Sequence, residues 1–235
     1  MTDLIEVEDL CETITVAHQN HSCSCLSLFD DGSLFWQRSQ PEYQPVISAE
    51  ELVSLENLLR ERRRLEPEKR VQLALDISAS LLQLNTTPWL EKCWTKDTIF
   101  FFRDSKGLRK VHTNYPVLLQ KYTGNPRNKP HEDEPELALL ELGVLLLEIW
   151  HRQTLEEWAS ESNNEFVNSP DGRMLVAIRW FKAVKDNLPP NYRDVVGRCL
   201  RPSVFDAFKL TWEDAAFRDA VYNNIVEPLL SSCAP

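Results

Sequence analysis

The sequence predicts a mainly α-helical fold of the α+β class that also contains two small β-hairpins. Three patterns carry this prediction: an apolar segment over residues 135–150, a series of amphipathic segments, and an Asp-Gly turn between alternating runs. The chain has 235 residues and is 43% hydrophobic, which is enough for a large core. We divide it into residues 1–47, an N-terminal helix and hairpin, and residues 48–235, a helical domain.

The sequence of the N-terminal part predicts one helix and one hairpin. Apolar residues at helical spacing predict a short amphipathic helix over residues 4–18. Asp31-Gly32, between two alternating runs, predicts a β-hairpin over residues 23–36. Period-two spacing places four apolar residues on one face of that hairpin: Leu26, Leu28, Leu34 and Trp36.

The next elements are two helices and a second hairpin. Ser48 followed by Glu51 has the spacing of a capping box, and predicts a helix from there to about residue 64. Pro67 opens a second helix that runs to residue 84 and has a wide apolar face. Aromatic and β-branched residues predict a strand over 98–102 that pairs with residues 108–112. The polar residues 113–134 predict a loop, with local helix around 116–121.

The segment 135–150, PELALLELGVLLLEIW, predicts the central helix of the fold. Pro135 suits a first helical position, and the segment is apolar on almost every side. It is too short to span a bilayer and contains carboxylates, so we expect it to form the axis of a large core.

Glu134, Glu141 and Glu148 are seven residues apart and form one narrow polar stripe on this helix. The stripe has two interpretations, either paired carboxylates for acid–base chemistry or acceptors for the surrounding loops. We favour the second interpretation, because a buried carboxylate needs hydrogen-bonding or charged partners.

The sequence of the C-terminal part predicts only helices and loops. Thr154 caps a short helix over 155–160, and residues 162–172 predict an exposed loop. Amphipathic patterns then predict helices over 174–188, 192–200 and 212–230, the last one capped by Thr211.

The composition narrows the classes of partner. The net charge is −10, from 26 basic and 36 acidic residues, which does not favour binding to nucleic acid or to an anionic membrane. The six cysteines are scattered, and the first residues lack the basic and apolar regions of a secretory leader. We therefore expect reduced thiols and an intracellular protein, cytoplasmic or nuclear.

No cofactor, metal or catalytic residue is predicted. The Gly-rich phosphate loops and the common hydrolase motifs are absent from the sequence. The tightest group of metal-type ligands is His18, His21, Cys23 and Cys25, but its spacing does not match a zinc site. We favour a strand that carries cysteines as small apolar residues, and we expect Cys199 to be inert core.

Three segments resemble the large lobe of protein kinases. LELGVLLLEI, at 140–149, resembles the kinase pattern W-S-x-G-V-x-L-x-E-[IL] of the central helix of that lobe. VVGRCL, at 195–200, resembles a late kinase helix that ends in C-L, and residues 73–84 resemble the helix before the catalytic loop. The resemblance implies a kinase C-lobe-like domain over 48–235, with residues 1–47 as a remnant of the small lobe.

A closer resemblance is to a fungal domain family of unknown function, DUF7580. It covers residues 10–230 approximately, and its most specific piece is T-P-W-L at 87–90. The family has no assigned activity. Its members usually follow an N-terminal helical region, which implies a third hypothesis, the C-terminal part of a signalling or cell-death-type protein.

The kinase resemblance lacks the residues that kinase chemistry requires. Residues 92–98, KCWTKDT, stand where H-R-D-x-x-x-x-N belongs, with Asp97 near the position of the asparagine. Thr113-Asn114-Tyr115 stands in place of D-F-G, and Ala138 in place of the aspartate that opens the central kinase helix.

We therefore expect a non-catalytic, pseudokinase-like interaction or scaffold module with a protein partner, whose oligomeric state stays open. The alternative is a diverged enzyme or ligand-binding domain that uses the degenerate cleft. Trp89, Trp94, Lys96 and Asp97 are the candidate cleft or interaction residues. The two tryptophans fit either core anchors or the rim of a peptide groove.

Overall fold

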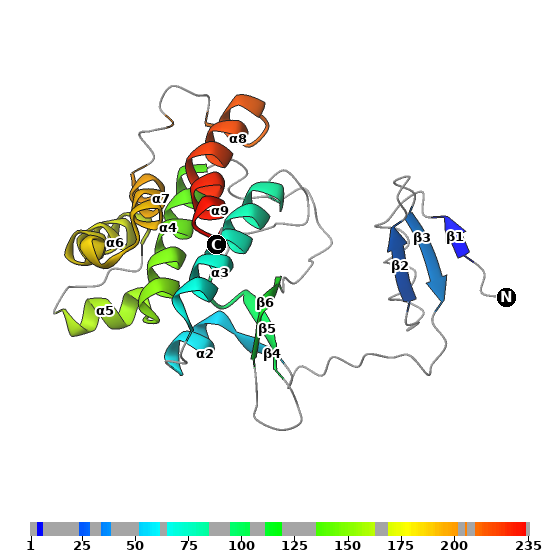
Figure 1. The fold of residues 1–235 in the computed structure, drawn as a ribbon, viewed down its shortest axis with the longest axis horizontal. Helices are drawn as coiled ribbons and strands as arrows, with labels where there is room; N and C mark the ends of the chain where they lie inside the picture. Colours follow the sequence, from blue (N-terminus) through cyan, green and yellow to red (C-terminus); the bar gives the residue numbers. More distant parts are fainter. Residues whose placement is uncertain are drawn as a thin grey trace. The chain divides into compact units, whose positions relative to one another are not determined.

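The structure is a computed structural model that describes residues 4–6, 24–28, 34–38, 52–61, 65–84, 95–103, 111–118, 135–162, 169–201, 205 and 210–233. The chain divides into two compact units, Met1–Ser48 and Ala49–Pro235 (Figure 1). The described residues are mainly helical, with small antiparallel sheets, which confirms the predicted class.

The first unit contains a three-stranded antiparallel sheet. Its strands are β1 (Leu4–Glu6), β2 (Ser24–Leu28) and β3 (Leu34–Arg38), in the order β1-β3-β2. The register pairs Leu26 with Trp36 and Leu28 with Leu34, so the predicted hairpin and its shared face are confirmed.

The predicted helix over residues 4–18 is wrong at its start. Leu4, Ile5 and Glu6 form strand β1, which pairs with β3. The open edge of β3 has unpaired backbone groups, and pairing them outweighs the weak helical pattern of so short a segment. Residues 7–18 lie outside the described part of the chain.

The second unit contains another three-stranded sheet, in the order β4-β5-β6. Strands β5 (Ile99–Arg103) and β6 (Val111–Leu118) form the predicted second hairpin. The predicted loop and local helix are wrong over residues 113–118, because β6 continues through them. The pairing of β5 with β6 runs from Ile99 and Leu118 at one end to Arg103 and Val111 at the other, with an irregular register between Phe100 and Phe102.

Strand β4 (Leu52–Ser54) replaces the start of the helix that was predicted from Ser48. Its Leu52 pairs with Phe102, so the outer edge of β5 takes these residues into the sheet. Helix α2 (Leu55–Arg60) therefore begins later, capped by Ser54, whose Oγ accepts a hydrogen bond from Asn57 N at 3.2 Å. Ser48 itself lies outside the described residues.

The two longest helices are α3 (Pro67–Leu84) and α4 (Pro135–His151), and both follow the predicted bounds closely. Every residue of α4 from Ala138 to Ile149 is buried, which confirms this helix as the axis of the core. Helices α3, α6 (Pro170–Val184) and α7 (Pro190–Leu200) pack against it.

The remaining helices show how capping residues set the bounds. Thr154 and Glu157 form a capping box at the start of α5 (Leu155–Glu161), as the predicted cap required. Helix α6 begins four residues before the predicted start at 174, because Ser169 caps it and Pro170 occupies its first turn. A short 3₁₀ helix, η2 (Lys185–Asn187), follows it.

The last predicted helix, over 212–230, is three elements: α8 (Ala215–Val221), the π-helical turn η4 (Tyr222–Val226) and α9 (Glu227–Cys233). Asp214 caps it in place of the predicted Thr211, because the Asp214 carboxylate accepts a hydrogen bond from Ala216 N at 2.9 Å.

Two polar side chains tie α4 to its neighbours. Tyr192 of α7 donates a hydrogen bond to the Leu146 carbonyl at 2.8 Å, and burial raises the pKa of this phenol. Arg70 of α3 donates to the Trp150 carbonyl at 2.8 Å and lies 5.5 Å from the centre of the Trp150 ring.

Gly143 sets the distance between α4 and α7. A Cβ added at this position would lie 2.9 Å from Cys199 Cβ and 2.9 Å from Leu200 Cδ2. The two helices therefore approach each other through the space that a side chain at Gly143 would occupy.

The pair Gly143→Ala and Gly197→Ala tests this packing. Alanine improves helix propensity by about 1 kcal/mol at both positions, but at Gly143 the clash with α7 costs on the order of 1–3 kcal/mol. A Cβ at Gly197 meets only Phe181 Cζ at 3.4 Å. In urea unfolding, Gly197→Ala is expected to be neutral or stabilising and Gly143→Ala to be the less stable variant. Equal stabilisation by both would contradict the close packing.

Candidate functional site

A cavity of about 450 Å³ in the second unit gathers charged residues from five parts of the chain. Helices α2, α4, α5 and α6 and the turn before β5 contribute to its lining. Five carboxylates and two cations surround it, together with one threonine and two aliphatic residues: Glu56, Asp97, Glu141, Glu148, Glu156, Lys96, Arg173, Thr95, Val144 and Leu145.

Two of the four predicted cleft residues lie in the described part of the chain. Lys96 and Asp97 both line this cavity, with Lys96 largely buried and Asp97 exposed. Trp89 and Trp94 lie outside the described residues. The structure therefore brings Lys96 and Asp97 together with carboxylates from the predicted glutamate stripe.

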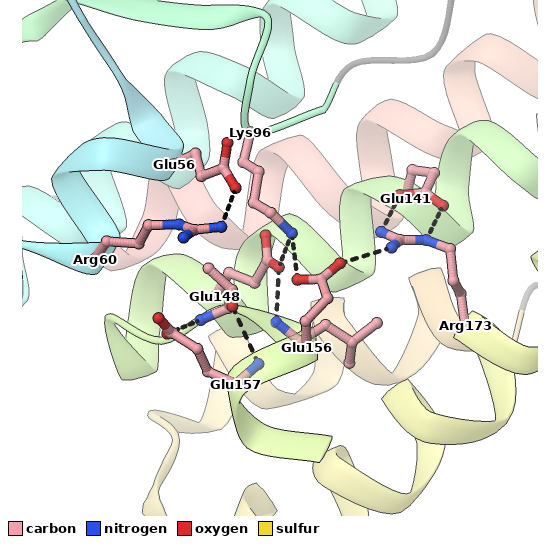
Figure 2. Close-up of polar contacts among 10 residues, drawn as sticks. Glu56, Arg60, Lys96, Glu141, Glu148, Glu156, Glu157 and Arg173 are labelled. Atoms are coloured by element: carbon pink, nitrogen blue, oxygen red, sulfur yellow. Dashed lines mark hydrogen bonds and ion pairs between the residues drawn. The ribbon is translucent and has the colours of Figure 1, made fainter. Parts of the chain in front are cut away.

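Lys96 lies between two glutamates (Figure 2). Its Nζ donates to Glu148 Oε1 at 3.0 Å and to Glu156 Oε2 at 2.6 Å. The Leu155 N–H donates to the same Glu148 oxygen at 2.9 Å. Glu148, whose side chain is only 1% exposed, therefore has a cationic partner and a backbone donor at the start of α5.

Arg173 continues the network on the α6 side (Figure 2). Its Nε and Nη2 donate to the two oxygens of Glu141, each at 2.9 Å, in a bidentate pair. Its Nη1 donates to Glu156 Oε1 at 3.1 Å, so Glu156 bridges both cations. We call these five residues the polar chain: Lys96, Glu141, Glu148, Glu156 and Arg173.

Local structure fixes each end of the polar chain. Glu141 and Glu148 are seven residues apart and so lie on one side of α4. The Thr154–Glu157 capping box fixes the start of α5, where Glu156 lies. On the opposite side, the Lys96 carbonyl accepts a hydrogen bond from Glu56 N at 2.9 Å, which holds the turn against α2.

Burial and pairing shift the ionisation of the polar chain. Burial raises the pKa of Glu148 to about 7, although Lys96 and the Leu155 amide oppose this shift. Burial also acts to lower the pKa of Lys96, but the two glutamates outweigh it and raise that pKa. Glu156 responds in the opposite sense, since Lys96 and Arg173 outweigh its burial and lower its pKa.

The polar chain has the features of a structural brace. Each cation contacts two carboxylates, and Glu148, with a pKa near neutrality, uses one oxygen for two donors. Glu141 and Glu148 thus accept hydrogen bonds from neighbouring elements, which is the interpretation of the glutamate stripe that the sequence favoured. Glu134 lies outside the described residues.

Sequence reasoning missed Glu156 and Arg173. The glutamate spacing on α4 indicated that hydrogen-bonding or charged partners lie nearby, but did not indicate which residues they are. Arg173 falls at the edge of a segment predicted as loop, and its place in the first turn of α6 depends on the Ser169 cap.

The other candidates from the sequence were a core cysteine and a group of metal-type ligands. Cys199 is fully buried in α7, as predicted, and burial raises the pKa of its thiol. Of the group His18, His21, Cys23 and Cys25, only Cys25 lies among the described residues, in β2. Within the described ranges, no three His, Cys, Asp or Glu residues are arranged to hold a metal ion.

The second unit thus belongs to the class of helical domains with a buried apolar axis and an internal charged cluster. The chain belongs to the family described as a domain of unknown function, DUF7580, whose model matches residues 1–235. A comparison with curated proteins gave no match. Among the described residues, none forms a helix long and apolar enough to cross a membrane.

Lys96→Met tests the brace. Removing the cation leaves Glu148 buried without a charged partner, so the free energy of unfolding is expected to fall by about 3 kcal/mol. Arg60→Met is the matched control, because Arg60 pairs with Glu56 at 2.8 Å on the surface, and its loss is expected to leave stability unchanged. Urea unfolding measures both, and an equal loss in the two variants would argue against a buried brace.

The pH dependence of stability tests the environment of Glu148. Its folded pKa, about 7, is above the unfolded value of 4.5, so the folded state binds more protons between these values. The contribution of Glu148 to stability is therefore present at low pH and falls as pH rises toward 7, by on the order of 1–3 kcal/mol. Glu148→Gln keeps the hydrogen-bond acceptor and removes the titration.

The measurement is the unfolding free energy of both proteins from about pH 5 to about pH 8. The wild type is expected to lose stability relative to Glu148→Gln across this range. A difference that stays constant would place the pKa of Glu148 outside it.

Proposed function

We propose that this protein is a non-catalytic, pseudokinase-like module for protein interaction or scaffolding, acting inside the cell. The observation that carries the proposal is the internal pairing of the polar chain, in which Lys96 and Arg173 are each held by two carboxylates. Charged groups used in this way support packing between elements and are not free to act on a substrate.

The fold gives this proposal further support. A buried central helix flanked by α3 and α7, preceded by the β5–β6 hairpin, has the order of elements that the kinase large lobe implies. Ala138, at the position of the kinase aspartate, is a buried apolar residue of α4. An intracellular location agrees with Cys199 and Cys233, which form no disulfide with any residue that the structure describes.

The alternative is a ligand-binding or diverged catalytic domain. The observation in its favour is the cavity of about 450 Å³, which contains Glu148 with a pKa of about 7 and the exposed Asp97. A general acid–base role for Glu148 would require Lys96 to move away from it, at the energetic cost of a buried, unpaired charge.

Nucleotide binding and hydrolysis separate the two functions. The melting temperature is measured with millimolar ATP, with and without Mg²⁺, beside an assay of phosphate release. The proposal predicts no shift in melting temperature and no hydrolysis above buffer. Hydrolysis that is lost in Asp97→Asn, with the melting temperature of that variant unchanged, would establish the catalytic alternative.

A further inference from the structure

A second cavity, of about 440 Å³, lies between α6 and α7 and has the opposite charge character. Four cations, one carboxylate, one aromatic residue and one glycine line it: Lys185, Arg193, Arg198, Arg201, Asp194, Phe181 and Gly197. The excess of cations is notable because the chain as a whole carries a net charge of −10. Charge of this sign, concentrated locally, indicates a site for an anionic group.

The internal contacts leave much of this basic charge available. Among the described residues, the Arg193 side chain forms an ion pair with the adjacent Asp194, at 3.5 Å and on the surface, where an ion pair is weak. The side chains of Lys185 and Arg201 form no ion pair with any residue in the described part of the chain. Arg198 is partly engaged, since its Nη1 donates to the Asn224 carbonyl at 2.8 Å.

Phe181 and Gly197 make one part of the cavity lining apolar. A Cβ at Gly197 would lie 3.4 Å from Phe181 Cζ, so the missing side chain leaves the edge of this ring beside the cavity. A ligand in this position would meet both cationic side chains and an aromatic ring. This combination suits a chain that carries both carboxylates and apolar groups.

The length of the basic surface indicates an extended ligand. Arg193 and Arg201 are eight residues apart along α7 and its C-terminal cap, which corresponds to about 12 Å at the rise of an α-helix. An extended peptide covers that distance with about four residues. A single phosphate group would engage only part of it, and the net negative charge of the chain opposes a long nucleic acid.

We propose that this basic cavity, between α6 and α7, binds an acidic peptide segment of a partner protein. Carboxylates of the segment pair with Lys185, Arg193 and Arg201, and an apolar side chain packs on Phe181. The inference rests on the proposed interaction function, for which it names the surface and the class of partner.

The test uses the full chain and a fluorescein-labelled peptide of about eight residues, rich in glutamate with one central phenylalanine. A peptide with glutamine in place of glutamate is the neutral control. The acidic peptide is expected to bind at least about tenfold more tightly than the neutral one, and more weakly as salt rises. Equal affinity for both peptides, or no binding at about 1 mM, would overturn the proposal.

Variants locate the binding surface. Arg193→Glu and Arg201→Glu are each expected to weaken binding at least about tenfold. Lys69→Glu, at an exposed lysine of α3, makes the same change in charge elsewhere and is expected to change binding less than about twofold. Arg201→Gln is a second, milder variant, and circular dichroism with thermal unfolding checks that each variant is folded. Unchanged affinity in the folded arginine variants would refute this location.

A competition experiment tests the class of ligand. A short single-stranded oligonucleotide is expected to displace the peptide less effectively than unlabelled acidic peptide does. Displacement at lower concentration by the oligonucleotide would overturn the assignment to a peptide. The result is independent of the nucleotide assay. Failure of the unmodified chain to bind the acidic peptide refutes only this surface, whereas ATP hydrolysis dependent on Asp97 refutes only the non-catalytic function.

Discussion

The carboxylate of Glu148 is the constraint around which the second unit is organised. It lies on a helix that is otherwise apolar, and its side chain is almost completely removed from water. A carboxylate in such a place must either be neutral or have donors close by. The turn before β5 provides Lys96 and the start of α5 provides the Leu155 amide. Both elements thus lie where they can donate hydrogen bonds to the Glu148 carboxylate.

The apolar part of α4 imposes a second requirement, which is close packing. Gly143 allows α7 to approach until Cys199 and Leu200 of α7 occupy the space of a side chain. Tyr192, also on α7, donates a hydrogen bond to the Leu146 carbonyl of α4. The polar chain holds α5 and α6 on one side, and these contacts hold α7 on another. Charge pairing and close packing thus act on different faces of the same helix.

The sequence predicted best where a signal was long and local. Helices α3 and α4 followed from proline at the start and many turns of consistent apolar pattern. Strands β1 and β4 were missed because three residues carry little pattern, and their conformation depends on the open edges of β3 and β5. The glutamate stripe indicated a buried polar site, but Glu156 and Arg173 could not be assigned to it. Their proximity arises from the packing of α5 and α6, which no local pattern records.

The two cavities give the second unit two surfaces of opposite charge. In the acidic one, Lys96 and Arg173 pair with the carboxylates of the lining, whereas the basic one retains cations without ion-pair partners among the described residues. This contrast agrees with the two proposals, a supporting role for the residues of the first cavity and peptide binding at the second. A double-mutant cycle between Lys96→Met and Glu148→Met measures the central claim, that the buried charges act as a brace. We predict a coupling energy of about 2 kcal/mol, with the double variant more stable than the sum of the single losses implies. A coupling below about 0.5 kcal/mol would contradict it.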